Sequence, residues 1–153
     1  MEINSKLLGK IEYEEDSVIK FEEGIIGITD KKEFIFIEKE DFLPFNYLQS
    51  TEDPDFSLIV INPFFVDKEY DYNISNDDLK SLNVKDDSDF FIVAIVVFAN
   101  NIENITVNLR APIIINIKTK AAKQVLLLND NYDIEEPLIK NGSFKSFLPS
   151  EQK

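Results

Sequence analysis

The stretch from Ile105 to Leu128 constrains the fold of this chain more strongly than any other part of the sequence. It opens with apolar residues that alternate with polar ones. This period of two predicts a strand with one buried face, carried by Ile105, Val107 and Leu109. The unbroken apolar run at 113–115 predicts a strand that is covered on both faces. Pro112 lacks an N–H group, so we expect it at a sheet edge, a bulge or a strand start.

A polar connection follows this strand, and it contains Lys118, Lys120 and Lys123. The return strand is predicted to begin at Gln124 and to continue through the apolar residues 125–128. Two buried strands joined by a basic loop would form a core hairpin. The polar residues of this hairpin are therefore the first candidates for a function.

The rest of the chain reads as short strand-like segments, about ten in all, separated by turn residues. One short helix is predicted at about residues 75–83, because Ser75 is a good N-cap and Asp78 stands at the capping-box position. Asn83 is expected to end it. The predicted fold class is mainly β, a compact antiparallel β-barrel-like single domain or closed sandwich with one short helix.

A chain of 153 residues fits one domain. We expect this domain to span residues 1–138 and residues 139–153 to form a C-terminal tail. The chain changes character from Glu135 onward, where clear apolar alternation is missing. The large apolar residues of the tail either dock on the barrel or serve as a free partner-binding segment: Phe144, Phe147 and Leu148. Docking or simple disorder is the favoured interpretation.

The composition excludes several kinds of chemistry. The chain contains no Cys and no His, so disulfides, thiol catalysis and His-based triads are excluded. The N-terminus has an early acid and lacks the apolar segment of a signal peptide. The longest apolar run, at 90–99, is about half of the ~20 residues that a membrane helix needs. We therefore expect a soluble cytoplasmic protein that does not act on a membrane.

The chain is strongly acidic, since 29 Asp and Glu residues against 16 Lys and Arg residues give a formal net charge of −13. Nucleic-acid-binding proteins usually carry a basic stripe, and only the loop 118–123 resembles one, so direct nucleic-acid binding is disfavoured. A basic protein partner is favoured instead, because opposite fields accelerate encounter. Plain solubility is the alternative explanation of the charge.

Clusters of acidic residues raise the question of a metal site. Asp67, Glu69 and Asp71 have the spacing of a calcium loop, but Tyr72 stands where an EF-hand needs Gly. The carboxylates at 130–136 suggest an alternative function, a metal-dependent hydrolase, although nothing in the sequence fixes their geometry. We expect no enzyme, and therefore no catalytic residue, cofactor or metal ligand.

Arg110 is the single arginine of the chain, and it stands on a strand whose other features favour burial. It is either a bidentate partner for a buried carboxylate or a recognition group presented at the surface. The pairing with a carboxylate is the favoured role.

The central run 106–116, TVNLRAPIIIN, resembles the most recognisable motif of the FliW flagellar assembly factors. Other family-like pieces occur in the expected order and spacing. They are Phe21…Gly24-Ile25…Gly27, Tyr47-Leu48-Gln49-Ser50, Asp53-Pro54, Asn62-Pro63-Phe64, Lys118-Thr119-Lys120, Lys123-Gln124-Val125, Leu127 and Tyr132…Pro137-Leu138. Each piece alone is weak, but the ordered set is specific, and the likeness covers residues 1–138.

The chain departs from the family pattern in three places. Glu22 and Ile26 stand where the family usually has prolines, and Lys120 and Ala122 stand where it commonly has an arginine and a glycine. Glu135-Glu136 replace a frequent Arg-His pair, which reverses the local charge before Pro137.

The resemblance to FliW implies a cytoplasmic, non-enzymatic binding protein with a β-barrel-like fold that is monomeric when free. It implies two partners, flagellin, for which such proteins act as chaperones, and the RNA-binding translational repressor CsrA. Export of flagellin would free the protein to bind CsrA and relieve the repression of flagellin synthesis. A purely structural acidic assembly protein is the blander alternative.

The candidate partner-binding residues are polar positions inside the matched motifs, which we expect to be exposed. They are Tyr47, Gln49, Asn108, Arg110, Lys118, Lys120, Lys123 and Gln124, with Glu52 and Asp53 added for a basic partner. Each has an alternative role as a turn, cap or ladder residue. Which surface contacts which partner stays open at this point.

Overall fold

The computed structural model describes residues 1–139, and within them the chain is mostly β, as predicted. The strands are β1 (Glu2–Ser5), β2 (Gly9–Glu12), β3 (Ile19–Phe21), β4 (Glu33–Ile37), β5 (Phe45–Ser50), β6 (Ser57–Ile61), β7 (Phe90–Val97), β8 (Thr106–Val107), β9 (Ile113–Asn116), β10 (Ala121–Gln124) and β11 (Glu136–Pro137). The α-helix of the described part is α1 (Asn76–Ser81). Short 3₁₀ turns lie at Glu15–Ser17, Glu40–Phe42, Pro63–Phe65, Asp87–Asp89 and Ile102–Asn104.

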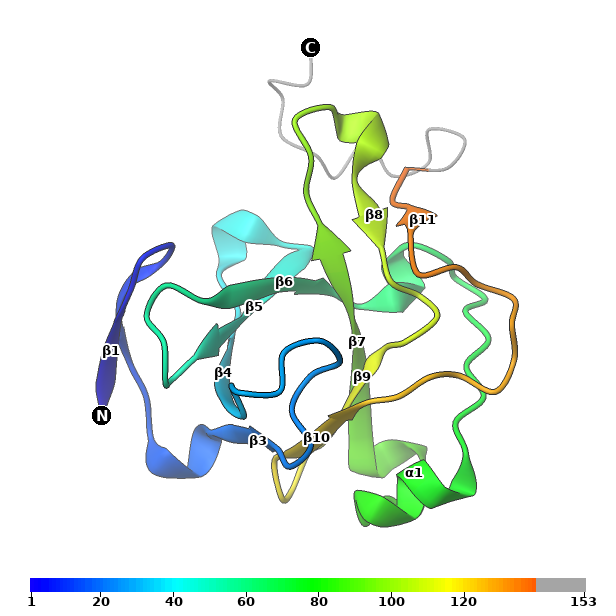
Figure 1. Cartoon of the computed structure of the whole chain (residues 1–153), viewed down its shortest axis with the longest axis horizontal. Coiled ribbons are helices and arrows are strands. Elements are labelled where there is room, and N and C mark those ends of the chain that lie inside the picture. Colours follow the sequence, from blue (N-terminus) through cyan, green and yellow to red (C-terminus); the bar gives the residue numbers. More distant parts are fainter. Residues whose placement is uncertain (140–153) are drawn as a thin grey trace.

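Seven strands close into a barrel, and Figure 1 looks into one of its open ends. Their order is β7-β6-β5-β4-β3-β10-β9, and β9 pairs again with β7 to complete the ring. The predicted barrel-like fold is therefore confirmed. One pair departs from the antiparallel rule, because β10 runs parallel to β3 with Ala121 opposite Lys20. β8 and β11 extend the sheet beyond β7, and β1 and β2 form a separate hairpin.

The apolar run at 113–115 serves two cores, one on each face of β9. Ile113 and Ile115 point into the barrel, where they join a cluster that includes Phe21, Phe34, Leu48 and Val60. Ile114 points outward into a second cluster, which lies under the segments that follow β6 and β10 and includes Leu109, Val125, Leu127 and Leu138. All three isoleucines are fully buried. The predicted burial on both faces is confirmed.

The hairpin exists, but its return strand begins earlier than predicted. β10 starts at Ala121 and ends at Gln124, so Lys123 belongs to the strand and not to the connection. Beyond β10 the same register continues, because the Val125 N–H donates to the Pro112 carbonyl and the Leu127 N–H to the Arg110 carbonyl. The run 125–128 is not uniformly buried: Leu126 and Leu128 are exposed. Pro112 directly precedes β9, one of the places predicted for it.

The predicted helix and its cap are confirmed. The Ser75 hydroxyl oxygen accepts a hydrogen bond from the Asp78 N–H at 3.1 Å, which satisfies one of the free donors of the first turn. After α1 the chain turns through Asn83, whose φ is 58°. The predicted capping box is wrong at Asp78, because this carboxylate contacts Lys123 instead. A capping box forms at Asp86 and Asp89, in the 3₁₀ turn before β7.

Gly24 closes a tight turn after β3 in which only glycine fits well. Its φ is +73°, and a Cβ atom placed there would lie 2.7 Å from the Thr29 Cα. We expect Gly24→Ala to lower the free energy of unfolding by roughly 2–4 kcal/mol, because left-handed strain adds to an overpacked contact. Urea unfolding followed by circular dichroism measures this loss.

Gly9 provides the matched control for this substitution. Its φ is +80°, but a Cβ atom at that position would have no heavy atom within 4 Å apart from those of Gly9 and its two chain neighbours. Gly9→Ala should therefore cost only the conformational strain, roughly 1–2 kcal/mol. Equal losses for the two variants would show that the contact with Thr29 is not what requires glycine at position 24.

The structure bears on the predicted tail and on the question of a membrane-spanning helix. The predicted tail lies outside the described residues except for Ile139, so the roles expected for Phe144, Phe147 and Leu148 stay predictions. Among residues 1–139, no helix has the length and apolar character needed to span a bilayer.

Candidate partner-binding surfaces

The predicted site residues fall into two groups in the structure. Gln49, Glu52 and Asp53 lie in or next to the β5–β6 turn, with Tyr47 further along β5. The others lie on the hairpin of β9 and β10 or on the segment that leads into it: Asn108, Arg110, Lys118, Lys120, Lys123 and Gln124. The two groups therefore have to be judged separately.

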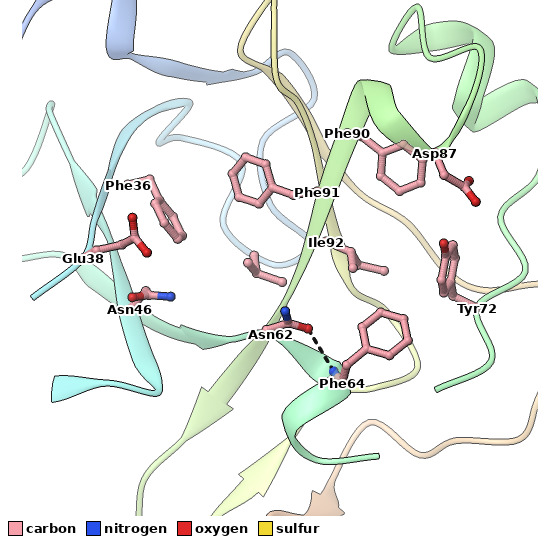
Figure 2. Close-up of a pocket in the computed structure, with 11 residues that line it drawn as sticks. Phe36, Glu38, Asn46, Asn62, Phe64, Tyr72, Asp87, Phe90, Phe91 and Ile92 are labelled. Carbon is pink, nitrogen blue, oxygen red and sulfur yellow. Dashed lines mark hydrogen bonds between the residues drawn. The ribbon is translucent and has the colours of Figure 1, made fainter. Parts of the chain in front are cut away.

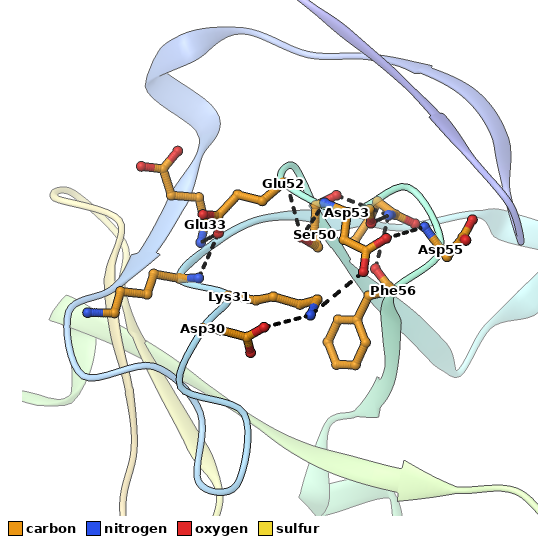
Figure 3. A network of polar contacts seen from close by, with 10 residues as sticks. Asp30, Lys31, Glu33, Ser50, Glu52, Asp53, Asp55 and Phe56 are labelled. Atoms are coloured by element: carbon orange, nitrogen blue, oxygen red, sulfur yellow. Dashed lines mark hydrogen bonds and ion pairs between the residues drawn. The ribbon is translucent and has the colours of Figure 1, made fainter.

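Figure 3 shows the β5–β6 turn from close by. The side chain that organises this turn is Gln49, near the end of β5. Its side chain is fully buried, although exposure was expected, because its Nε2 donates to the carbonyls of Ser50, Asp53 and Phe56 at 3.0–3.2 Å. The Ser50 hydroxyl oxygen accepts from the N–H groups of Glu52 and Asp53, both at 3.0 Å. Gln49 therefore fixes the shape of the turn from within.

The carboxylates of this turn are held by main-chain donors. Glu52 Oε1 accepts from the N–H groups of Lys32 and Glu33 at 2.7 and 3.0 Å, which ties the turn to the start of β4. Asp53 Oδ1 accepts from the Asp55 N–H at 2.9 Å. Because the turn is ordered before any partner arrives, binding through it would require little additional ordering.

One lysine lies among these acids. Lys31 Nζ is 3.1 Å from Asp30 Oδ2 and 3.7 Å from Asp53 Oδ2, and it lies 5.3 Å from the centre of the Phe56 ring. The hydrogen bond with Asp30 raises the pKa of Lys31, and the same bond lowers the pKa of Asp30. We call Asp30, Glu52, Asp53 and Asp55 the acidic turn. The acidic turn presents a negatively charged surface to solvent, because Asp30, Glu52 and Asp55 are exposed.

The basic loop of the hairpin is smaller than the sequence suggested. Asn116 Oδ1 accepts from the N–H groups of Lys118 and Thr119, and its Nδ2 donates to the Leu82 carbonyl, so this buried amide shapes the turn. Lys120 has a φ of 64°, and its Nζ donates to the Ile117 carbonyl at 2.6 Å. Of the three predicted lysines, only Lys118 is exposed, and Lys120 and Lys123 are half-buried. The hairpin therefore presents no basic patch.

Lys123 packs against the helix. Its Nζ is 2.8 Å from Asp78 Oδ1 and 3.9 Å from Glu23 Oε2, and both members of the closer pair are about four-fifths covered, with side chains 22% and 19% exposed. The hydrogen bond with Asp78 is the main cause that raises the pKa of Lys123. The pair joins β10 to the first turn of α1, which is a structural role.

This pair gives a pH-dependent prediction. We expect Asp78→Asn to lower the free energy of unfolding by about 1 kcal/mol at pH 7, because a partly buried charged hydrogen bond is lost. A raised lysine pKa means that the stabilisation is complete below the ordinary value of 10.5 and disappears as pH rises through the folded-state value. The difference in free energy of unfolding between variant and parent should therefore vanish at a pH above the folded-state pKa of Lys123.

Asp77→Asn is the control, since Asp77 lies on the same helical turn and undergoes the same charge change. Asp77 is exposed and has no ion pair among residues 1–139. The Asp77 variant should lose a few tenths of a kcal/mol, the usual effect of an exposed acid near a helix N-terminus. If both variants lost the same stability with the same pH profile, the close pair with Lys123 would contribute nothing specific.

Gln124 and Tyr47 are also buried, contrary to expectation. Gln124 Oε1 accepts from the Ile26 N–H at 3.0 Å, and Nε2 donates to the Ala111 carbonyl at 2.9 Å, so the side chain holds the Gly24–Gly27 loop against the hairpin. The Tyr47 ring packs edge-on against Phe42 with centroids 5.6 Å apart, and burial raises its pKa. Both residues can affect a partner only by shaping the surface.

Asn108 and Arg110 lie on the segment between β8 and β9. Asn108 Oδ1 accepts from the Ala111 N–H at 2.9 Å and thereby forms the turn before Pro112. The favoured pairing of Arg110 with a carboxylate is wrong within the described part of the chain, where no such ion pair is present. Its Nε is buried and makes no hydrogen bond there.

Sequence reasoning missed a groove beside β7. It has a volume of about 560 Å³, and Figure 2 shows its lining residues on both sides of the strand. Aromatic and aliphatic side chains form most of the wall, and Glu38, Asp87, Asn46 and Asn62 supply its polar groups. Burial, and then the charge of Asp87, raise the pKa of Tyr72 at one end. No local pattern could reveal the groove, because its walls come from β4, β5, β7 and the turns next to them.

The acidic clusters in the described part of the chain do not assemble into a metal site. Within residues 1–139, no three His, Cys, Asp or Glu side chains lie where they could hold one ion. Asp67 Oδ2 accepts from the Tyr132 hydroxyl, and the buried Glu136 accepts from the Asp133 N–H at 2.7 Å. The alternative of a metal-dependent hydrolase therefore has no site in the part of the chain that the structure describes.

Comparisons with known proteins show that the chain is similar to flagellar assembly factors. The model of the FliW protein family matches residues 2–138. A flagellar assembly factor FliW from Clostridium novyi (strain NT) is 41% identical over 142 residues, which cover 93% of this chain and 99% of the relative. One from Thermoanaerobacter pseudethanolicus is 40% identical over 91% of this chain and 93% of its own length. A crystal structure of the flagellar assembly factor FliW superposes with a TM-score of 0.85 at 32% identity, covering 92% of this chain and 99% of that one.

Proposed function

This chain belongs to the FliW family of flagellar assembly factors, and on that premise we propose that it binds flagellin as a chaperone and binds the repressor CsrA. In this scheme, export of flagellin frees the protein to bind CsrA and to relieve the repression of flagellin synthesis. The protein acts in the cytoplasm, without catalysis, and is a monomer when free. The observation that carries the proposal is membership of the family over almost the whole domain.

The acidic turn supports a basic partner. Asp30, Glu52 and Asp55 are exposed there, and the whole chain has a formal net charge of −13. A protein that binds RNA carries basic surface, and an acidic protein approaches it faster and also repels the RNA. Of the predicted residues, Glu52, Asp53 and Lys118 are the ones we propose as direct contacts. Gln49, Gln124 and Tyr47 position the surface from below.

Titration calorimetry of the full chain with purified flagellin and with purified CsrA at low salt tests the proposal. We expect one-to-one binding in each case, and CsrA binding should weaken as salt is added, because exposed charges are screened. Absence of heat with both partners at low salt would overturn the proposed function.

A pair of variants locates the contact. Asp55 makes no side-chain hydrogen bond or ion pair in the described chain, so Asp55→Lys leaves the turn intact. Glu103→Lys makes the same change of charge in the 3₁₀ turn before β8, which Figure 1 shows at the top of the molecule, away from the β5–β6 turn at the left. At low salt, Asp55→Lys should weaken CsrA binding by about tenfold and Glu103→Lys by much less. Equal effects would remove the acidic turn as the contact surface.

A further inference from the structure

Among residues 1–139, the first half of β7 has a strand partner on only one side. β9 pairs with it from Phe90 to Val93, whereas β6 pairs only with residues 94–96. β6 stops at Ile61, where Asn62 and Pro63 begin a 3₁₀ turn that leads the chain away. The first half of β7 is therefore hydrogen-bonded to β9 on one side, and its other side is an open strand edge. The groove lies along this open edge.

Two hydrogen bonds establish which main-chain groups face the open edge. The Ile117 N–H donates to the Asp89 carbonyl, and the Asn108 N–H donates to the Ile95 carbonyl, so odd-numbered positions of β7 face β9 and β8. Main-chain groups alternate in direction along a strand. The N–H and C=O groups of Phe90 and Ile92 therefore point to the open side, where they make no hydrogen bond with residues 1–139.

The groove beside this edge is apolar with acidic margins, as Figure 2 shows. Phe36, Phe91 and Ile92 contribute apolar wall, and the carboxylates of Glu38 and Asp87 are exposed. Asn46 Oδ1 is buried in the lining and accepts no hydrogen bond among the described residues. A buried acceptor without a donor is costly, so an occupant that brings N–H groups would be favoured.

We propose that this groove binds a short extended segment of a partner protein, which adds a strand to the open edge of β7 and alternates apolar side chains with lysine or arginine. Unpaired strand edges bind extended chains through main-chain hydrogen bonds, and pockets beside them select side chains. The acidic margins select the basic residues by charge. About four residues, roughly 13 Å of strand, would match the free length of β7.

A helix is a poorer occupant, because its main-chain groups already bond to each other. The proposal rests on the proposed function only in that the segment belongs to a protein partner. It does not depend on which partner supplies the segment.

Amide hydrogen exchange of the full ¹⁵N-labelled chain tests the open edge directly. In the free protein, the amides of Phe91 and Val93 should exchange slowly and those of Phe90 and Ile92 at least tenfold faster, because only the first pair is bonded to β9. Slow exchange at Ile92 that is independent of concentration would mean that the chain itself covers the edge. Protection that grows with concentration would mean that a second copy does. Either result overturns the proposal.

The probe for binding is the peptide acetyl-Lys-Val-Lys-Val-Lys-Val-amide. It should bind saturably, shift the resonances of Phe90 and Ile92, and slow the exchange of the Ile92 amide. The same peptide with alternate residues N-methylated keeps its charge and side chains but loses main-chain donors, and it should bind at least tenfold more weakly. Equal binding of the two peptides, or binding that leaves Phe90 and Ile92 unchanged, would overturn strand addition.

A charge-removal variant tests whether the acidic residues select a basic peptide. The double variant Glu38→Gln, Asp87→Asn should bind the lysine peptide severalfold more weakly, but its binding of a peptide with Gln in place of Lys should be unchanged. Equal effects on the two peptides would refute selection by charge.

If intact flagellin or CsrA binds and neither protects the Ile92 amide from exchange, the groove proposal fails while the proposed function stands. If the peptide protects Ile92 and neither intact protein binds, the function fails while the groove stands.

Discussion

Replacing Ile115 by alanine is expected to remove about 3–4 kcal/mol of stability, the usual cost of emptying a fully buried isoleucine site. Ile115 is fully buried in the barrel, in the cluster that also contains Phe21, Phe34 and Ile113. Because domains of this kind are stable by roughly 5–15 kcal/mol, this single loss should shift the urea midpoint strongly. Chemical unfolding followed by circular dichroism measures it.

Ile117→Ala is the control for this substitution, in the same hairpin and with the same atoms removed. Ile117 follows β9 and is 44% exposed. Its replacement should cost less than about 1 kcal/mol, as expected for a surface site. If the two variants lost similar stability, the placement of Ile115 in the barrel interior would be wrong.

Gln49→Leu is expected to cost about 2–3 kcal/mol, because three carbonyls of the β5–β6 turn lose the same donor. The loss of the unpartnered, buried Gln49 Oε1 offsets part of this cost. The variant should also unfold the acidic turn locally, so the amides of Glu52 and Asp53 should exchange faster than in the parent. Urea unfolding and amide exchange measure the two effects.

Asn46→Leu is the matched control on the same strand. The Asn46 Oδ1 is buried without a partner, and its side chain makes no hydrogen bond with residues 1–139. Its replacement should change stability by less than about 1 kcal/mol in either direction. A loss as large as that of Gln49→Leu would show that volume, not hydrogen bonding, governs both sites.

The sequence pattern predicted those parts of the fold that depend on residues close together in the chain. The run 113–115 indicated a strand covered on both faces, and the structure places its members in two cores. Ser75 indicated the helix start through a bond that spans three residues. Such features are local, so the sequence pattern contains them. The same holds for the ordered motifs that identified the family.

Predictions failed where a side chain has a distant partner. Gln124 looked like an exposed polar residue, but its amide contacts Ile26, which lies 98 positions away. Asp78 satisfied the spacing of a capping box, but Lys123 on β10 takes its carboxylate. Amide and carboxylate groups accept many partners, and only the tertiary packing around β10, with the Gly24–Gly27 loop and with α1, selects one. The site residues were therefore less predictable than the fold.

The proposed partner exchange requires that flagellin displace CsrA from the protein. The direct test uses fluorescently labelled CsrA in a preformed complex with the full chain, to which unlabelled flagellin is added while anisotropy is followed. We predict that flagellin lowers the anisotropy to that of free CsrA, with a midpoint that rises with the concentration of the complex. Anisotropy that stays constant or rises, as in a ternary complex, would contradict partner switching.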